Sequence, residues 1–306
     1  MKSQLATTAL LPLTAVLAIA GEPVMETQQE SINPFAKAIN PISNPTLADL
    51  ALPRTNIHAM FMHHRLPNEI SLAGGDVELG GDLNLLAIQL EYAFNERFSI
   101  VATKDGYIDF NPDKTLEDQE GFANLAAGVK YAFIYDTVNQ FAMSGTAVVE
   151  VPTGNRDVFQ GYGDGAVNLI VNGLKLHDNW QFSGSIGTHV PFDSDAESLT
   201  GFASAHVSYR LTEKFIPLVE INWFHTFEEG DGTETPISVT DFEGGDLINL
   251  GSSNAKVNED IVTLALGARY IISDSVNIGA AYEIPLTDEE DNLMRDRFTF
   301  DLVWEF

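Results

Sequence analysis

The last ten residues, 297–306, read RFTFDLVWEF. The apolar side chains of this stretch alternate with polar ones: Phe298, Phe300, Leu302, Trp304 and Phe306 on one side, Thr299, Asp301 and Glu305 on the other. A period of two places the two sets on opposite faces of a β-strand. The C-terminus therefore predicts a sheet with one apolar and one polar face.

The same alternation recurs from residue 55 onward. It predicts twelve strands, at 55–66, 79–94, 97–110, 120–135, 138–152, 162–176, 179–191, 199–211, 214–228, 258–272, 275–287 and 294–306. These segments are longer than the roughly 9–11 residues with which a tilted strand crosses a bilayer. Short turns alternate with long polar loops between them, which is typical of barrels with short periplasmic turns and long extracellular loops. We predict an all-β fold, a 12-stranded antiparallel transmembrane β-barrel; a soluble sandwich would show the same alternation.

The N-terminus differs from the rest of the chain. Residues 5–20, LATTALLPLTAVLAIA, are apolar and end in a small-residue cleavage pattern, so 1–20 are predicted to be a signal peptide. Pro34, Pro41, Pro45 and Pro53 break any regular element within residues 21–54 and predict an irregular segment, either a periplasmic leader or a plug inside the barrel. Residues 55–306 would form the barrel, and the expected location is the outer membrane.

Composition excludes several classes of function. There are 44 acidic against 16 basic side chains, a net charge of -28, and no cysteine. Nucleic acid is not expected as a partner, because binding it needs a basic surface. The lack of cysteine excludes disulfide scaffolds and thiol enzymes. No cofactor or metal is predicted: His58, Met60, Met62 and His64 share one strand face, but a two-residue period spreads them over about 20 Å.

The polar face would line the lumen. Its predicted ionisable residues are Glu91, Lys130, Glu150, His189, His206, Arg210, Glu220, Arg269, Glu283, Asp301 and Glu305. Both signs occur, so the set is either a mutually paired interior or a charged constriction that sets solute selectivity. A 12-stranded barrel falls between the filled 8-stranded and the open 16-stranded kinds, which allows a narrow passage.

One set of polar residues has the composition of a hydrolase site. His206 and Ser208 share a strand face, and the next turn brings Glu220 opposite His206. Glu, His and Ser in hydrogen-bonding order can activate a serine nucleophile. The spacing resembles that of the outer-membrane lipid A deacylase, but the alternation predicts that these side chains point into the lumen. A hydrogen-bonded lumen cluster is the preferred interpretation, and no catalytic residue is assigned.

Four stretches resemble known proteins. Residues 149–157, VEVPTGNRD, and 161–165, GYGDG, resemble the Pro-Thr-Gly loop of the MetA-pathway (phenol-degradation) outer-membrane family, and 102–109, ATKDGYID, is similar to uncharacterised transporter-like barrels. The last strand, ending in Phe306, resembles the C-terminal assembly signal of Gram-negative outer-membrane barrels. It implies the barrel-assembly machinery and outer-membrane lipids as partners.

The family resemblance implies a function but carries no catalytic residues. We expect a channel or transporter that passes small, aromatic or hydrophobic solutes through the lumen. Two alternatives remain open. One is a structural or surface-display barrel with a closed lumen, and the other is a lipid-modifying hydrolase that uses His206, Ser208 and Glu220.

Overall fold

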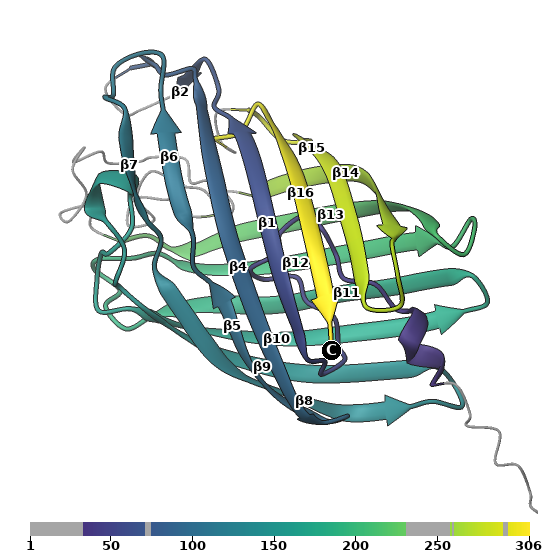
Figure 1. The fold of residues 1–306 in the computed structure, drawn as a ribbon. Coiled ribbons are helices and arrows are strands. Elements are labelled where there is room, and N and C mark those ends of the chain that lie inside the picture. The colour runs from purple at the N-terminus through teal and green to yellow at the C-terminus, as the bar shows by residue number, and fades with distance from the viewer. Residues whose placement is uncertain (1–32, 71–74, 231–257, 259, 290–292) are drawn as a thin grey trace, which may run out of the picture. The chain divides into compact units, whose positions relative to one another are not determined.

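A computed structural model describes residues 33–70, 75–230, 258, 260–289 and 293–306. Residues Pro34–Phe306 form one compact unit, a closed 12-stranded antiparallel β-barrel (Figure 1). The predicted fold class is confirmed. The predicted signal peptide lies outside the described residues. Among the residues described, no helix is long and apolar enough to cross a membrane.

The strands occur where the alternation predicted them. Their bounds are β1 Asn56–Arg65, β4 Asp82–Asn95, β5 Phe98–Lys104, β6 Tyr107–Asn111, β7 Gln119–Phe122, β8 Leu125–Asp136, β9 Phe141–Val151, β10 Ala166–His177, β11 Trp180–Pro191, β12 Leu199–Tyr209, β13 Phe215–Glu228, β14 Asp260–Ile271, β15 Val276–Pro285 and β16 Asp296–Glu305. A small hairpin, β2 Glu69–Ile70 with β3 Val77–Glu78, lies in the first long loop.

Strand β1 closes the barrel. It pairs with β16 on one side, where Phe61 lies opposite Phe300, and with β4 on the other, where Phe61 lies opposite Leu86. From β8 to β16 each strand pairs with its neighbours in the chain; β4 pairs with β5 and, farther out, with β6, and β5 pairs with β8. We use "inner end" for the end with the short turns and "outer end" for the end with the long loops.

Two predicted strands are interrupted toward the outer end. The stretch 97–110 breaks at Asp105 and Gly106 into β5 and β6, and 120–135 breaks at Ala123 and Asn124 into β7 and β8. Gly106 has φ +129°, and a Cβ there would lie 2.9 Å from Leu85 Cδ1. Only glycine tolerates this backbone conformation at such a close approach. The breaks let β6 and β7 continue beyond the ring as extensions of β5 and β8 (Figure 1).

The apolar face of the wall points outward. Large apolar side chains that are at least two-fifths exposed recur around it: Phe61, Leu90, Ile100, Val129, Val171, Ile186, Val219, Leu266, Tyr282 and Phe300. A surface of this kind, running around the whole barrel, is the belt that contacts lipid in outer-membrane barrels. The inward face carries the polar residues, which are described below.

A charge in the middle of this belt should be costly. Ile186 lies midway along β11 and is 60% exposed. In lipid, Ile186→Lys is expected to lower the free energy of unfolding by about 2–4 kcal/mol, because the ammonium enters the hydrocarbon. Reversible denaturant unfolding in phospholipid bilayers measures this. Val138 is 88% exposed in the turn between β8 and β9, so Val138→Lys is the matched control and should change little. Equal effects of the two substitutions would contradict a lipid-facing belt.

Candidate functional site

Residues 34–54, which we name the luminal segment, run inside the barrel. Their only regular element within the described chain is the short 3-10 helix η1, Pro34–Lys37. Phe35 and Leu50 pack on inward side chains of β9 and β10, and Ile39 and Ile42 pack on those of β13 to β15. The segment therefore occupies space that would otherwise be an open passage.

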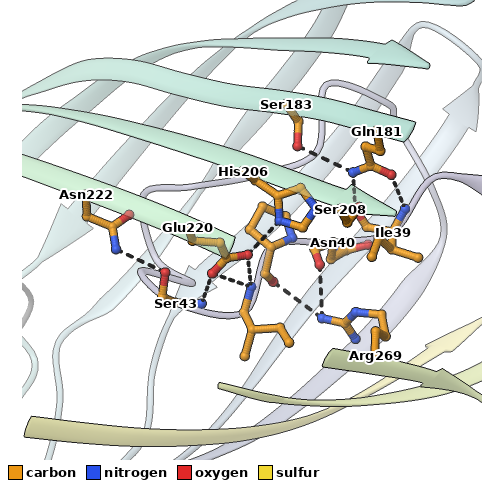
Figure 2. Close-up of polar contacts among 12 residues, drawn as sticks. Ile39, Asn40, Ser43, Gln181, Ser183, His206, Ser208, Glu220, Asn222 and Arg269 are labelled. Carbon is orange, nitrogen blue, oxygen red and sulfur yellow. Dashed lines mark hydrogen bonds and ion pairs between the residues drawn. The ribbon is translucent and has the colours of Figure 1, made fainter. Parts of the chain in front are cut away.

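Glu220 on β13 holds the middle of this segment. Its carboxylate accepts hydrogen bonds from the backbone N–H groups of Ile42, at 3.0 Å, and Ser43, at 2.7 Å (Figure 2). Asn222, two residues along the same face, donates from its side chain to Ser43 Oγ at 3.0 Å. The turn at Ile42–Ser43 is thus bound to one strand of the wall by its backbone as well as by a side chain.

His206 and Ser208 on β12 complete the cluster that the sequence suggested. His206 Nδ1 lies 2.7 Å from Glu220 Oε1, and His206 Nε2 lies 3.0 Å from Ser208 Oγ (Figure 2). All three residues are about 2% exposed and point inward. This is the hydrogen-bond order of a serine hydrolase triad. Here the same carboxylate also binds the luminal segment, so the cluster is built into the contact between the segment and the wall.

Two further side chains hold the backbone of the segment. The Gln181 amide on β11 bonds both the N–H and the carbonyl of Ile39, at 2.9 and 2.8 Å. The Arg269 guanidinium on β14 donates to the carbonyl of Asn40 at 3.0 Å (Figure 2). It also forms an ion pair with Asp301 at 2.7 Å. These bonds satisfy backbone groups that form no helix or sheet, which is the condition for burying an irregular chain.

The predicted lumen residues all lie on the inward side of the wall or at its inner rim, and each has a polar partner. Glu91 and Asp49 bind Lys130; Glu150 binds Lys104; His189 binds Glu197; Asp301 binds Arg269 and His58; Glu283 binds Arg297; Glu305 binds Arg54; and Arg210 donates to the carbonyl of Lys37. Buried charges in a low-dielectric interior need such partners.

Sequence reasoning missed several of these partners. Arg297 is fully buried, and its place in the alternation, two residues before Thr299, would have put it on the inward face. Lys104 was obscured by the strand break that follows it. Asp49 and Arg54 belong to the luminal segment, and no local pattern reveals that they meet β8 and β16.

One side of the outer lumen is mainly apolar. A pocket there is lined mainly by apolar side chains from β1, β4, β6 and the loop after β9, with Pro45 and Thr46 of the luminal segment. Its apolar lining comprises Met60, Met62, Leu83, Leu85, Ala87, Ile108, Ala123, Val158 and Phe159, and its polar lining includes Gln89, Lys104 and Gln160. On β4 both faces are apolar at this level, because Leu83 and Leu85 point inward while Leu86 is 61% exposed.

An apolar cluster adjoins the pocket on its outer side. It contains Leu66, Ile70, Leu79, Phe110 and Leu293 and shares Leu83, Ile108, Ala123 and Val158 with the lining of the pocket. The apolar pocket and its adjoining cluster thus occupy the side of the outer lumen next to β1, β4 and β6, while ion pairs such as Lys104–Glu150 and Arg297–Glu283 lie elsewhere at the same end. Within the described part of the chain, no group of three or more His, Asp or Glu side chains could hold a metal ion.

The fold is similar to that of solved outer-membrane channels and porins. Among solved structures, the COG4313 outer membrane channel from Pseudomonas putida F1 superposes with a TM-score of 0.60 at 13% identity, covering 88% of this chain and 100% of that one. The NanC porin gives 0.49 at 7% identity, covering 82% and 100%. At these identities the likeness shows the fold alone. No curated protein matches the sequence.

A family match confirms the resemblance seen in the sequence. It runs over residues 93–295, from the end of β4 to the loop before β16, which is more than half of the chain. The protein therefore belongs to the family described as "Putative MetA-pathway of phenol degradation".

Proposed function

We propose that this protein is an outer-membrane channel that binds small apolar or aromatic solutes in the outer half of its lumen. The observation that carries the proposal is the apolar pocket, because the lumen of a membrane barrel is ordinarily polar. Ligand sites are typically apolar hollows with a few polar groups that orient the ligand. Gln89, Lys104 and Gln160 supply such groups here.

The family name supports the same solute class. It refers to phenol degradation, and phenol combines an apolar ring with one hydroxyl group. The ring would lie against Met60, Met62 and Leu85, and the hydroxyl would find hydrogen-bond partners on the polar side of the pocket. The solute would pass without covalent chemistry. In the cell, we infer that the terminal strand with Phe306 directs the chain to the barrel-assembly machinery and that outer-membrane lipids surround the belt.

The luminal segment would act as a gate. It occupies the inner half of the lumen and is held by hydrogen bonds and ion pairs rather than by a continuous sheet. When it is displaced, Lys130, Glu220, Arg269 and Asp301 would face an open passage and could then set solute selectivity.

A second candidate function is hydrolysis by Ser208, favoured by the hydrogen-bond chain from Glu220 through His206. Ser208 lines a pocket at the inner end of the barrel with Gln181 and Arg210. Both of these side chains, however, already bind carbonyls of the luminal segment. A catalytic Ser208 should react with a fluorophosphonate probe, and Ser208→Ala should abolish that labelling. If neither the intact protein nor one lacking residues 21–54 is labelled at Ser208, the hydrolase candidate fails.

Ligand binding in the pocket should depend on the apolar side chain of Met62. Met62 is 1% exposed and lines the pocket. Met62→Gln puts an amide against apolar walls at a cost of about 1–2 kcal/mol, which should weaken 4-fluorophenol binding by about 5- to 30-fold. Fluorine NMR of the protein in nanodiscs, against empty nanodiscs, measures this affinity. Met143, on the outward face of β9, offers the control Met143→Gln. Unchanged affinity in Met62→Gln would exclude this pocket as the binding site.

Deleting the luminal segment should open the channel. Removing residues 21–54 is expected to raise single-channel conductance in planar bilayers at least tenfold, because the inner half of the lumen loses its filling. Removing only 21–33 is the control, since it keeps the luminal segment, and it should conduct like the intact chain. Heat-modifiable mobility on gels establishes that each variant has formed a barrel. A folded 21–54 deletion that stays silent would contradict the gate.

A further inference from the structure

The inward faces of β1 and β4 change from apolar to polar along the lumen. Residues that lie opposite each other follow in this order from the outer to the inner end: Met62 and Leu85, Met60 and Ala87, His58 and Gln89, Asn56 and Glu91. The first two pairs are apolar, and the last two are polar. A solute that moves inward along these strands therefore leaves an apolar surface and meets a polar one.

A second, smaller pocket lies at the polar level of these strands. Its lining includes Asn56 and His58 of β1, Glu91 of β4, Thr146 of β9 and Asp49 of the luminal segment. We name it the polar pocket. The carboxylates of Asp49 and Glu91 share the ammonium group of Lys130, and each carboxylate can accept several hydrogen bonds. The polar pocket is therefore rich in acceptors.

The apolar and the polar pocket meet at a boundary of four residues that line both. Pro45 and Thr46 belong to the luminal segment, and Gln89 and Thr103 belong to the wall. Gln89 Nε2 donates to the carbonyl of Pro45 at 2.9 Å and also to that of Thr103. The Gln89 amide thus links the luminal segment to the wall at the place where one pocket ends and the other begins.

The two ends of this amide differ in what they bind. Both acceptors of Nε2 are backbone carbonyls, and Thr103 lies where the pairing of β5 with β8 shifts register, between Ala102 and Lys104. Gln89 Oε1, in contrast, accepts no hydrogen bond from the described residues. An amide oxygen has two lone pairs, so Oε1 is an acceptor available to a solute at the boundary.

This boundary favours a solute that carries a hydrogen-bond donor. A hydroxyl group on an aromatic ring can donate to Gln89 Oε1 and, farther inward, to the carboxylates of Asp49 and Glu91. An ether of the same shape can donate to none of them. Polar groups that have lost water and gain no partner make entry costly, which is how a site built on hydrogen bonds rejects an analogue without the hydroxyl.

We propose that solutes pass the luminal segment along the inward face of β1 and β4, and that Gln89 is the specificity-determining residue that admits those with a hydrogen-bond donor. This inference rests on the proposed function of the apolar pocket. The solute class it names is neutral aromatic alcohols. The polar pocket is the second site on their route, and the hydroxyl group enters it before the ring.

Two photoreactive probes test the route. One is 4-[3-(trifluoromethyl)diazirin-3-yl]phenol, and the other is its methyl ether, which lacks the donor. The full chain in nanodiscs is photolysed with each probe, and the labelled residues are mapped by mass spectrometry. Labelling of Ala48 and Thr146, which line only the polar pocket, is divided by labelling of Met60 and Met62 in the apolar pocket. This ratio is expected to be at least about fivefold higher for the phenol than for the ether, the change expected from one net hydrogen bond.

A substitution tests the role of Gln89. Gln89→Lys keeps donors for the carbonyls of Pro45 and Thr103 but removes the acceptor, so the ratio for the phenol should fall to that for the ether. Asn168→Leu is the matched control: Asn168 is also a buried lumen amide, it bonds His189, and it lines neither pocket. The control should keep the ratio of the unaltered chain.

The outcomes separate this route from the function of the apolar pocket. Equal ratios for the two probes in the unaltered chain, or no labelling of Ala48 and Thr146, would overturn the route while 4-fluorophenol still binds. This comparison needs no substitution and holds even if Gln89→Lys does not fold. A folded Gln89→Lys protein that keeps the preference for the phenol would overturn the role of Gln89. A chain that neither binds 4-fluorophenol nor is labelled at Met60 and Met62 would overturn the proposed function as well.

Discussion

Every backbone polar group of a chain in a bilayer must be satisfied within the protein, and this constraint organises the whole structure. The ring closes because β1 pairs with both β16 and β4. Closure forces the alternating residues to divide between lipid and lumen. Where the ladder is interrupted, side chains bond backbone groups: Asn155 accepts the N–H of Phe122 beside β9, and Asp105 accepts the N–H of Ile88 at the break between β5 and β6.

The lumen that closure creates is narrow enough for its charges to be buried. Lys130, Arg269 and Arg297 are all fully buried, and each is paired with a carboxylate. Some of the partners come from the luminal segment: Asp49 binds Lys130, and Arg54 binds Glu305. The segment and the wall therefore depend on each other electrostatically. Displacing the segment would take Asp49 away from Lys130 and Arg54 away from Glu305.

The inner and outer parts of the lumen differ in what occupies them. The luminal segment fills the inner half, and the outer half holds an apolar pocket with a few polar groups beside β1, β4 and β6. The Pro-Thr-Gly loop lies beside these features: Val158 and Phe159 line the pocket, while Thr153 and Asn155 are exposed. The motif by which this sequence resembles its family thus forms part of the barrel wall.

The sequence by itself determined the strands, their two faces and the family. A period of two is a local property, so the inward places of Glu220, Arg269 and Asp301 could be read from their own strands. The tertiary structure decided which of these residues meet. That Asp49 reaches Lys130, that Glu220 holds Ile42 and Ser43, and that Met62, Leu85 and Phe159 share one pocket depends on how twelve strands are registered around a closed ring. Local patterning cannot supply that register, because it arises from pairings between distant parts of the chain.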